Sequence, residues 1–197
     1  MEKDFYIFRH GQTDANLKNI WQGCMCDFRL NATGKRQASD LAKKMKDVNL
    51  DIIYSSPLRR AKQTALYVAK RNSFSPKVEI IEDLREGNFG EAEGYEIDCL
   101  IKRFPEIVEK FMYPTRRTWN IAFPGKGSES KQQIFDRVIG AVKEIAYRPG
   151  NVIGIATHGG VLNALACGLN LPKTQFDNCD VIHLRYNSTG GIFTFIE

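Results

Sequence analysis

Residues 6–16 read Tyr-Ile-Phe-Arg-His-Gly-Gln-Thr-Asp-Ala-Asn and decide the fold. The apolar run from Phe5 to Phe8 predicts a buried strand, which ends at once at Arg9, His10 and a glycine that permits a change of backbone direction. In an open α/β sheet, ligands bind at the carboxyl ends of the strands. A guanidinium matches phosphate oxygens with a planar set of donors, an imidazole can act as nucleophile or base, and Asn16 adds a neutral donor. This stretch therefore predicts a site for a phosphoryl group.

A second stretch, Val152 to Gly160, repeats this design. It reads as a strand, then His158, then two glycines and a helical run. Arg-His-Gly alone would occur by chance in many chains, and a buried structural histidine is the alternative in both places. However, the chain has three histidines, and two of them follow predicted strands and precede glycine. Packing alone does not explain this pairing, so we expect His10 and His158 to share one site.

The composition is typical of an ordinary globular protein. The 197 residues are 43% hydrophobic and 26% charged, which suits one sizeable core, so we expect a single domain over residues 1–197. The net charge of +5 suits small anionic substrates, and because the basic residues are scattered, we expect no nucleic-acid partner. No apolar run approaches a membrane span or a signal core, and the five cysteines show no Cys-x-x-Cys spacing. We expect a cytoplasmic protein with no membrane partner, and the sequence leaves the oligomeric state open, a homodimer included.

Predicted strands and helices alternate along the chain. Further strands are expected at residues 51–56, 78–82, 181–186 and 192–196, and helices at 58–71, 131–147 and from a cap at Asn31 or Thr33 to 47. Residues 91–110 are helical but irregular, with a break at Pro105, and residues 113–128 are expected to form a loop or lid. Alternating strands and helices predict an α/β fold with a mostly parallel sheet covered on both faces.

Arg59 and Arg60 lie in the first turn of the helix predicted to follow Pro57. A cation at a helix N-terminus opposes the helix dipole, so this pair is unfavourable unless an anion lies near. The arginine pair therefore supports an anion site at the start of this helix.

The chain resembles the histidine phosphatase superfamily, also called the phosphoglycerate mutase-like family. The resemblance rests on four motifs in order: Arg9-His10-Gly11-Gln12-Thr13, Ser-Ser-Pro-Leu-Arg-Arg-Ala-Lys-Gln-Thr-Ala at 55–65, Leu-Arg-Glu-Gly-Asn-Phe-Gly at 84–90, and Thr157-His158-Gly159-Gly160. It implies a three-layer α/β/α sandwich and a first histidine that is transiently phosphorylated. It makes His10 the nucleophile, Arg9 and Arg60 the phosphate clamp, His158 the second histidine of the pocket and Glu86 the proton donor. Arg59 is then expected at the rim or in solvent.

The chemistry supports this assignment. A phosphate monoester dianion repels anionic nucleophiles, so a neutral imidazole is a suitable attacker, and fixed cations stabilise the charge on the phosphoryl oxygens. We expect Arg9, Arg60 and a protonated His158 to supply that charge, with no metal and no cofactor. Glu86 must donate a proton to the leaving oxygen and later take one from water, which predicts a bell-shaped pH dependence of the rate. Three other carboxylates nearby are alternatives for this role: Glu82, Glu91 and Glu93.

Several residues are weaker candidates for substrate contacts. Asn16 is an expected contact or a turn cap, and Gln22-Gly23 a contact or a tight loop. Gly159 is expected at the pocket, and Arg116-Arg117 resembles the arginine pair with which mutases of the family hold their substrate, although a solvated loop pair is the common case. The remaining candidates are rejected: His183 lies mid-strand and is expected to be structural, and Cys24 and Cys26 lack the further ligands of a metal site.

The resemblance leaves three functions to compare. Mutases of the family carry a longer insertion after the glutamate motif and a longer tail, and this chain is short in both places, which favours a phosphatase acting on a small phosphate monoester. A phosphoglycerate mutase-type transferase is the alternative. A catalytically silent protein that binds phosphorylated ligands is the alternative of another class, and the presence of a suitable residue at all five catalytic positions argues against it. The sequence does not identify the substrate.

Overall fold

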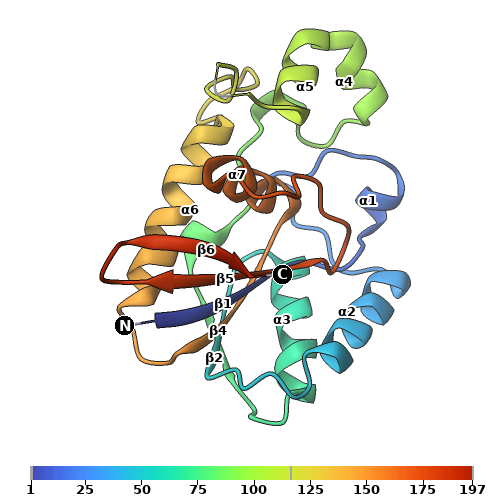
Figure 1. The fold of residues 1–197 in the computed structure, drawn as a ribbon. Coiled ribbons are helices and arrows are strands. Elements are labelled where there is room, and N and C mark those ends of the chain that lie inside the picture. Colours follow the sequence, from blue (N-terminus) through green and yellow to red (C-terminus); the bar gives the residue numbers. More distant parts are fainter. Residues whose placement is uncertain (1, 116, 197) are drawn as a thin grey trace.

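The computed structural model describes residues 2–115 and 117–196. Its centre is a six-stranded sheet in the order β3-β2-β4-β1-β5-β6 (Figure 1). The four strands from β3 to β1 are parallel, and β5 and β6 continue the sheet in antiparallel fashion. The prediction of a mostly parallel α/β sheet is confirmed. The strands are β1 Glu2–Arg9, β2 Ile52–Ser55, β3 Lys77–Ile80, β4 Val152–Thr157, β5 Val181–Asn187 and β6 Ile192–Ile196.

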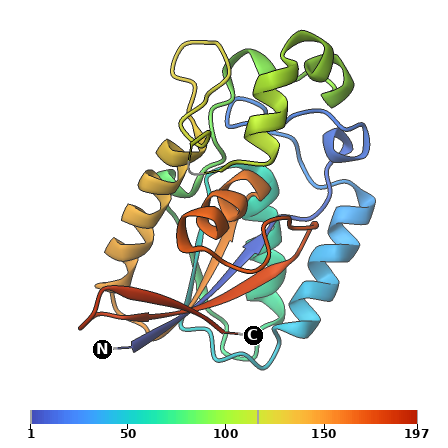
Figure 2. The ribbon, with the colours of Figure 1, turned by 45° about the horizontal axis from the view of Figure 1, so that its top comes forward.

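Helices cover both faces of the sheet, giving the expected three layers (Figure 2). One face packs against α2 (Ala32–Lys44) and α3 (Arg59–Arg71). The other face packs against α6 (Lys131–Ala146) and α7 (Gly159–Leu169). The predicted helices are thus confirmed, with Asn31 rather than Thr33 as the cap of α2.

The apolar side chains of β1 contribute to the cores on both faces of the sheet. Phe5 and Ile7 are fully buried in the cluster under α6 and α7, while Phe8 is buried in the cluster with α2 and α3. Successive side chains of a strand point to opposite faces, so a continuous apolar run is what a strand covered on both sides requires. This packing holds the end of β1, and therefore Arg9 and His10, in a fixed place.

The segment between β3 and α6 lies over the carboxyl ends of the parallel strands (Figure 1). It contains two short 3₁₀ helices (Glu82–Leu84 and Gly90–Ala92), then α4 (Ile97–Arg103) and α5 (Pro105–Met112), with Pro105 at the first position of α5. An aromatic cluster anchors the segment, since Phe111 and Phe123 pack against Trp21 with ring centroids 5.9 and 5.2 Å away. The short helix α1 (Asp14–Leu17) lies beside it. Within the described residues, no helix or strand occurs between 113 and 128.

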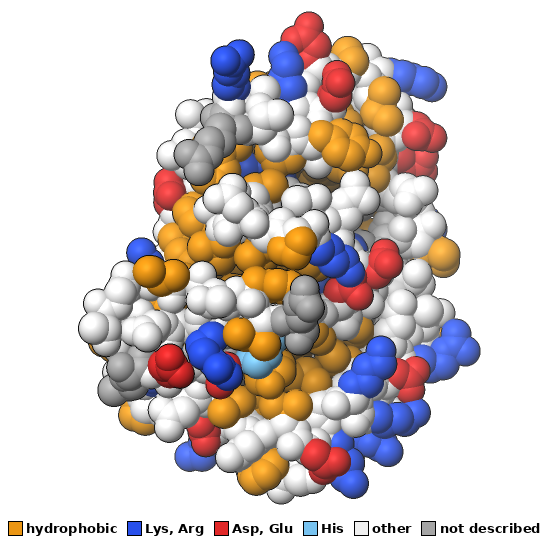
Figure 3. Space-filling view, viewed as in Figure 1, with side chains coloured by type: hydrophobic (Ala, Val, Ile, Leu, Met, Phe, Trp, Pro, Cys, Tyr) orange, Lys and Arg blue, Asp and Glu red, His pale blue; other side chains and the backbone are white. Residues whose placement is uncertain are grey.

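The surface carries charges of both signs. Figure 3 shows exposed apolar side chains in the middle of one face, with basic and acidic side chains mixed mostly along its edges. In the part of the chain that the structure describes, no helix has the length and hydropathy needed to cross a membrane.

Candidate active site

The pairing of β1 with β4 brings the two histidine motifs together. Arg9 and Thr157 are partners at the ends of these parallel strands, and the backbone N–H of His10 donates to the carbonyl of Thr157 at 3.0 Å. The rings of His10 and His158 follow at once, with centroids 5.3 Å apart. Two imidazoles separated by most of the sequence therefore meet at the carboxyl edge of the sheet, where the sequence placed them.

His10 is held as a neutral ring. Its side chain is 3% exposed, and its Nδ1 lies 2.7 Å from the carbonyl oxygen of Gly11. Because a carbonyl only accepts hydrogen bonds, this contact assigns the proton to Nδ1 and leaves a lone pair on Nε2. Burial, followed by the charges of Arg60 and Arg9, holds the pKa of His10 well below its usual range. A neutral imidazole with a free Nε2 is the form that a nucleophile needs.

Arg60 is the second residue of α3 and is completely buried. Its Nε donates to Nδ1 of His158 at 3.2 Å, and its Nη atoms donate to the carbonyls of Cys26 at 2.6 Å and Gly23 at 3.1 Å. These bonds fix the guanidinium beside both histidines. Gly23, expected as a substrate contact or as part of a tight loop, accepts a hydrogen bond from Arg60 through its carbonyl oxygen.

His158 is neutral in this arrangement, and the expected protonated ring belongs to the phosphate-bound site. Its Nδ1 accepts the bond from Arg60, and its Nε2 lies 2.7 Å from the hydroxyl of Ser56. Burial and the neighbouring charge of Arg60 hold the pKa of His158 well below its usual range. Protonation of this ring would require an anion close by, and that remains a prediction.

Arg9 presents an unused donor to the site. Its Nη1 donates to the carbonyl of Phe176 at 2.6 Å, while its buried Nε has no hydrogen-bond partner among the described residues. A buried donor without a partner is unfavourable, so this atom is suited to an anion bound beside His10. Arg59, by contrast, is exposed and pairs with Asp27 at 3.4 Å.

Glu86 is the carboxylate that the structure places in the site. It is 5% exposed, and its two oxygens accept hydrogen bonds from the backbone N–H groups of Gly87 and Gly160, each at 2.9 Å. A Cβ at position 160 would overlap Glu86, so the glycine at the start of α7 allows this approach. The alternatives lie elsewhere. Glu82 is exposed, Glu91 forms an ion pair with Arg103, and Glu93 accepts bonds from the backbone of Met25 and Phe89.

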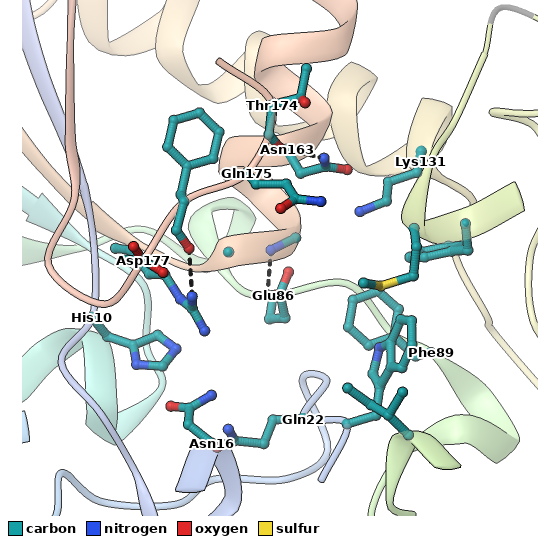
Figure 4. A pocket seen from close by; sticks show the side chains of 18 of the residues that line it. His10, Asn16, Gln22, Glu86, Phe89, Lys131, Asn163, Thr174, Gln175 and Asp177 are labelled. Atoms are coloured by element: carbon teal, nitrogen blue, oxygen red, sulfur yellow. Dashed lines mark hydrogen bonds between the residues drawn. The ribbon is translucent and has the colours of Figure 1, made fainter. Parts of the chain in front are cut away.

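These groups border a cavity of about 450 Å³ (Figure 4). Arg9, His10 and Glu86 line it, together with three further predicted contacts: Asn16, Gln22 and Gly159. Asn16 also caps a turn, because its Oδ1 accepts from the N–H of Thr13 at 3.0 Å, and its contact with substrate stays a prediction. The cavity wall, as far as the described residues form it, includes neither Arg60 nor His158.

The predicted arginine pair is not part of this wall. Arg117 is exposed and is not among the described residues that line the cavity, and Arg116 lies outside the described residues. The aromatic side chains on the wall are instead Trp21, Phe89 and Phe111, along with Tyr113 and Phe176.

Sequence reasoning missed Lys131 and Ser56. Lys131 lines the cavity from the first turn of α6 and is 5% exposed, and Ser56 contacts Nε2 of His158. The dipole argument that favoured an anion near Arg60 applies equally to a lysine just after the cap Ser130, so a signal for Lys131 was present. Ser56 carried no signal beyond its place in the second motif.

The remaining sequence candidates lie outside the site. His183 stacks on Tyr6 with ring centroids 4.2 Å apart and contacts Asp4 at 2.8 Å, so it belongs to the sheet. Cys24 and Cys26 are free thiols. Among the described residues, no group of three His, Cys, Asp or Glu side chains is arranged to hold a metal ion.

Comparisons with known proteins agree with this fold. The family model of the histidine phosphatase superfamily (branch 1) matches residues 5–196. The chain is 35% identical over 161 residues to an uncharacterized phosphatase PhoE of Bacillus subtilis, covering 81% of this chain and 73% of that protein. It is 32% identical over 188 residues to a metal-independent phosphoserine phosphatase of Arabidopsis thaliana, covering 92% and 76%. The structure of a phosphoglycerate mutase from Bacillus anthracis str. Sterne superposes with a TM-score of 0.87 at 27% identity, covering 100% of this chain and 92% of that one.

Proposed function

Because this chain belongs to the histidine phosphatase superfamily, we propose that it is a phosphoric monoester hydrolase whose phosphoryl group passes through His10. The observation that carries this proposal is the state of His10, a neutral ring with its proton fixed on Nδ1 by Gly11 and Nε2 free beside buried arginines. The substrates are small phosphorylated molecules, in keeping with the phosphatases among its relatives.

In the first step, Nε2 of His10 attacks phosphorus and the bond from phosphorus to the ester oxygen breaks. Glu86, protonated at the start, donates its proton to that oxygen, so the leaving group departs as an alcohol. The phosphorylated ring keeps the Nδ1 proton, which Gly11 holds through its carbonyl. The N–H groups of Gly87 and Gly160 stabilise the carboxylate that Glu86 becomes.

Fixed positive charge supports this transfer. The charges of Arg60 and Arg9 both lower the pKa of His10, and the Nε of Arg9 has no partner among the described residues. A phosphoryl group on His10 would offset that charge and favour protonation of His158, which supplies a third cation.

In the second step, a water molecule attacks the phosphorus of phosphohistidine. The Glu86 carboxylate takes a proton from the water, the bond from Nε2 to phosphorus breaks, and inorganic phosphate leaves. His10 returns to its neutral form and Glu86 to its acid form, so atoms and charges balance over the cycle.

The proposal is tested by hydrolysis of 4-nitrophenyl phosphate in the presence of a chelator. We expect the wild type to release phosphate and His10→Ala to lose nearly all activity, while His183→Gln, outside the cavity, keeps it. Activity that persists in His10→Ala would contradict the proposal. Phosphoryl transfer from a bisphosphoglycerate to a monophosphoglycerate, faster than phosphate release, would instead identify a mutase.

A further inference from the structure

Lys131 is a buried cation that the proposed chemistry leaves unused. It occupies the first position of α6, after a capping box of Ser130 and Gln133 that fixes the start of the helix. Within residues 2–115 and 117–196, its Nζ has no ion pair or hydrogen bond, and its contact is the face of the Phe111 ring, 4.5 Å away. A buried ammonium near a helix N-terminus opposes the dipole and loses hydration. The contact with Phe111 offsets only part of this cost, because the pKa of Lys131 stays lowered, with burial as the main cause.

The Lys131 side chain is aimed at the cavity. Figure 4 shows its amine pointing into the space from the side opposite His10, with Glu86 between the two. Since Glu86 is the proposed proton donor to the ester oxygen, the phosphoryl group lies on the His10 side of Glu86. The leaving group then extends toward Lys131.

Further polar groups gather at this end of the cavity. Asn163 donates from Nδ2 to the carbonyl of Thr174 at 2.7 Å, while its buried Oδ1 has no hydrogen-bond partner among the described residues. Gln175 points its amide into the same space (Figure 4). A buried cation and a buried acceptor, both without partners, indicate a ligand with an anionic group and a donor at this end.

We propose that Lys131 determines substrate specificity by binding a second anionic group, a carboxylate or a second phosphate, on the leaving group of the phosphate monoester. This inference rests on the proposed function, because it takes its orientation from His10 and Glu86. Asn163 accepts a hydrogen bond from a hydroxyl or amino group of the same leaving group.

Pairs of substrates that differ in the anionic group test this proposal. 3-Phosphoglycerate is compared with glycerol 3-phosphate for the carboxylate, and fructose 1,6-bisphosphate with fructose 6-phosphate for the second phosphate. We expect the wild type to prefer one anionic member by kcat/KM, and Lys131→Met to lower kcat/KM for that member about 10-fold or more and for its partner less than about 2-fold. Lys131→Arg restores part of the preference, and Lys143→Met, an exposed lysine of the same helix, changes neither.

The preference should also depend on pH. Burial lowers the pKa of Lys131 to about 8, while two nearby groups, Glu86 of the loop after β3 and Cys167 of α7, act in the opposite direction and raise this pKa. The ratio of kcat/KM within a pair cancels any pH dependence that both members share. We therefore expect the preference for the anionic member to fall as the pH rises through about 8 in the wild type and to stay flat in Lys131→Met.

Thermal unfolding distinguishes a lost subsite from a lost fold in Lys131→Met. Since Lys131 is an unpaired buried charge, Lys131→Met is expected to melt at a higher temperature than the wild type at pH 7. Equal falls in kcat/KM for both members of each pair, or a wild type without preference, would overturn the inference.

The subsite is also measured without turnover, by calorimetric binding of the same pairs to His10→Ala and to His10→Ala combined with Lys131→Met. A binding preference that Lys131→Met removes supports the subsite, whether or not the wild type hydrolyses 4-nitrophenyl phosphate. A failure of that hydrolysis counts against the proposed function alone. Equal binding of both members to His10→Ala would overturn the subsite.

Discussion

At the scale of single residues, Glu86 shows how position selects one carboxylate from several. Glu82, Glu91 and Glu93 are close in sequence, yet Glu86 alone of the four lines the cavity and accepts the N–H at the start of α7. A proton donor acts on the leaving oxygen, so its importance depends on how basic that oxygen is. Nitrophenolate leaves without a proton, whereas an alkoxide does not.

Glu86→Gln therefore has a substrate-dependent effect. We expect kcat/KM to fall about 100-fold or more for an alkyl phosphate and about 10-fold or less for 4-nitrophenyl phosphate, measured by phosphate release. Glu82→Gln, which alters an exposed side chain, is the matched control and should leave both values unchanged. An equal fall for the two substrates would show that Glu86 acts in some other way.

At the scale of elements, close packing of α2 against the loop after β1 positions His10. A Cβ on Gly34, in the first turn of α2, would overlap the backbone carbonyl of Gln12, and one on Gly11 would overlap the carbonyl of Gly34. The N–H of Gly11 in turn donates to the hydroxyl of Thr64 on α3 at 3.1 Å. Both helices therefore hold the loop that carries the nucleophile.

Gly34→Ala should accordingly reduce both stability and activity. Because the overlap is with backbone, the helix or the loop must move, and we expect a loss of about 1–3 kcal/mol in the free energy of unfolding, measured with urea. Gly140→Ala is the matched control, since a Cβ there meets nothing within 4 Å inside α6. It should stabilise the protein by about 0.5–1 kcal/mol. Equal stability of Gly34→Ala and the wild type would contradict this packing.

The sequence predicted these elements better than their mutual contacts. Continuous apolar runs predicted β1 and β4, and a helical period predicted α6, because both patterns depend on local burial. The third strand begins and ends earlier than predicted, since Glu82 starts a 3₁₀ helix. Which side chains of residues 91–128 would face the cavity was not predictable, because no regular period relates them to it.

At the scale of the whole molecule, the topology brings two arginines beside two buried histidines. Residues from the ends of β1 and β4, the start of α3 and the loop after β3 meet at one edge of the sheet. The sequence motifs predicted these residues because each lies in or next to a helix or strand that the sequence also predicts: His10, Arg60, Glu86 and His158. Lys131 was missed because its burial depends on α5, 20 residues away, whose Phe111 ring it contacts.

The two buried histidines should make stability depend on pH. Burial holds the pKa of both well below 6.5, so below that value the unfolded chain binds protons that the folded protein does not. Stability should be unaffected by these groups above pH 6.5 and fall below it, by about 1.4 kcal/mol per pH unit for each histidine until its folded pKa is reached. Urea unfolding at pH 7, 6 and 5 measures this. His10→Asn should reduce the slope by the contribution of one histidine, about 1.4 kcal/mol per pH unit. An identical slope in that variant would refute the lowered pKa of His10.

Transfer of the phosphoryl group to His10 is tested most directly by locating it on the protein. A substrate labelled in its phosphate is mixed with the enzyme, the reaction is stopped in alkali within milliseconds, and peptides are analysed by mass spectrometry. We predict a label on His10 that survives alkali and is lost in acid, present in wild type and His158→Ala and absent from His10→Asn. A fully active enzyme that carries no label on His10 at any time of mixing would contradict the mechanism.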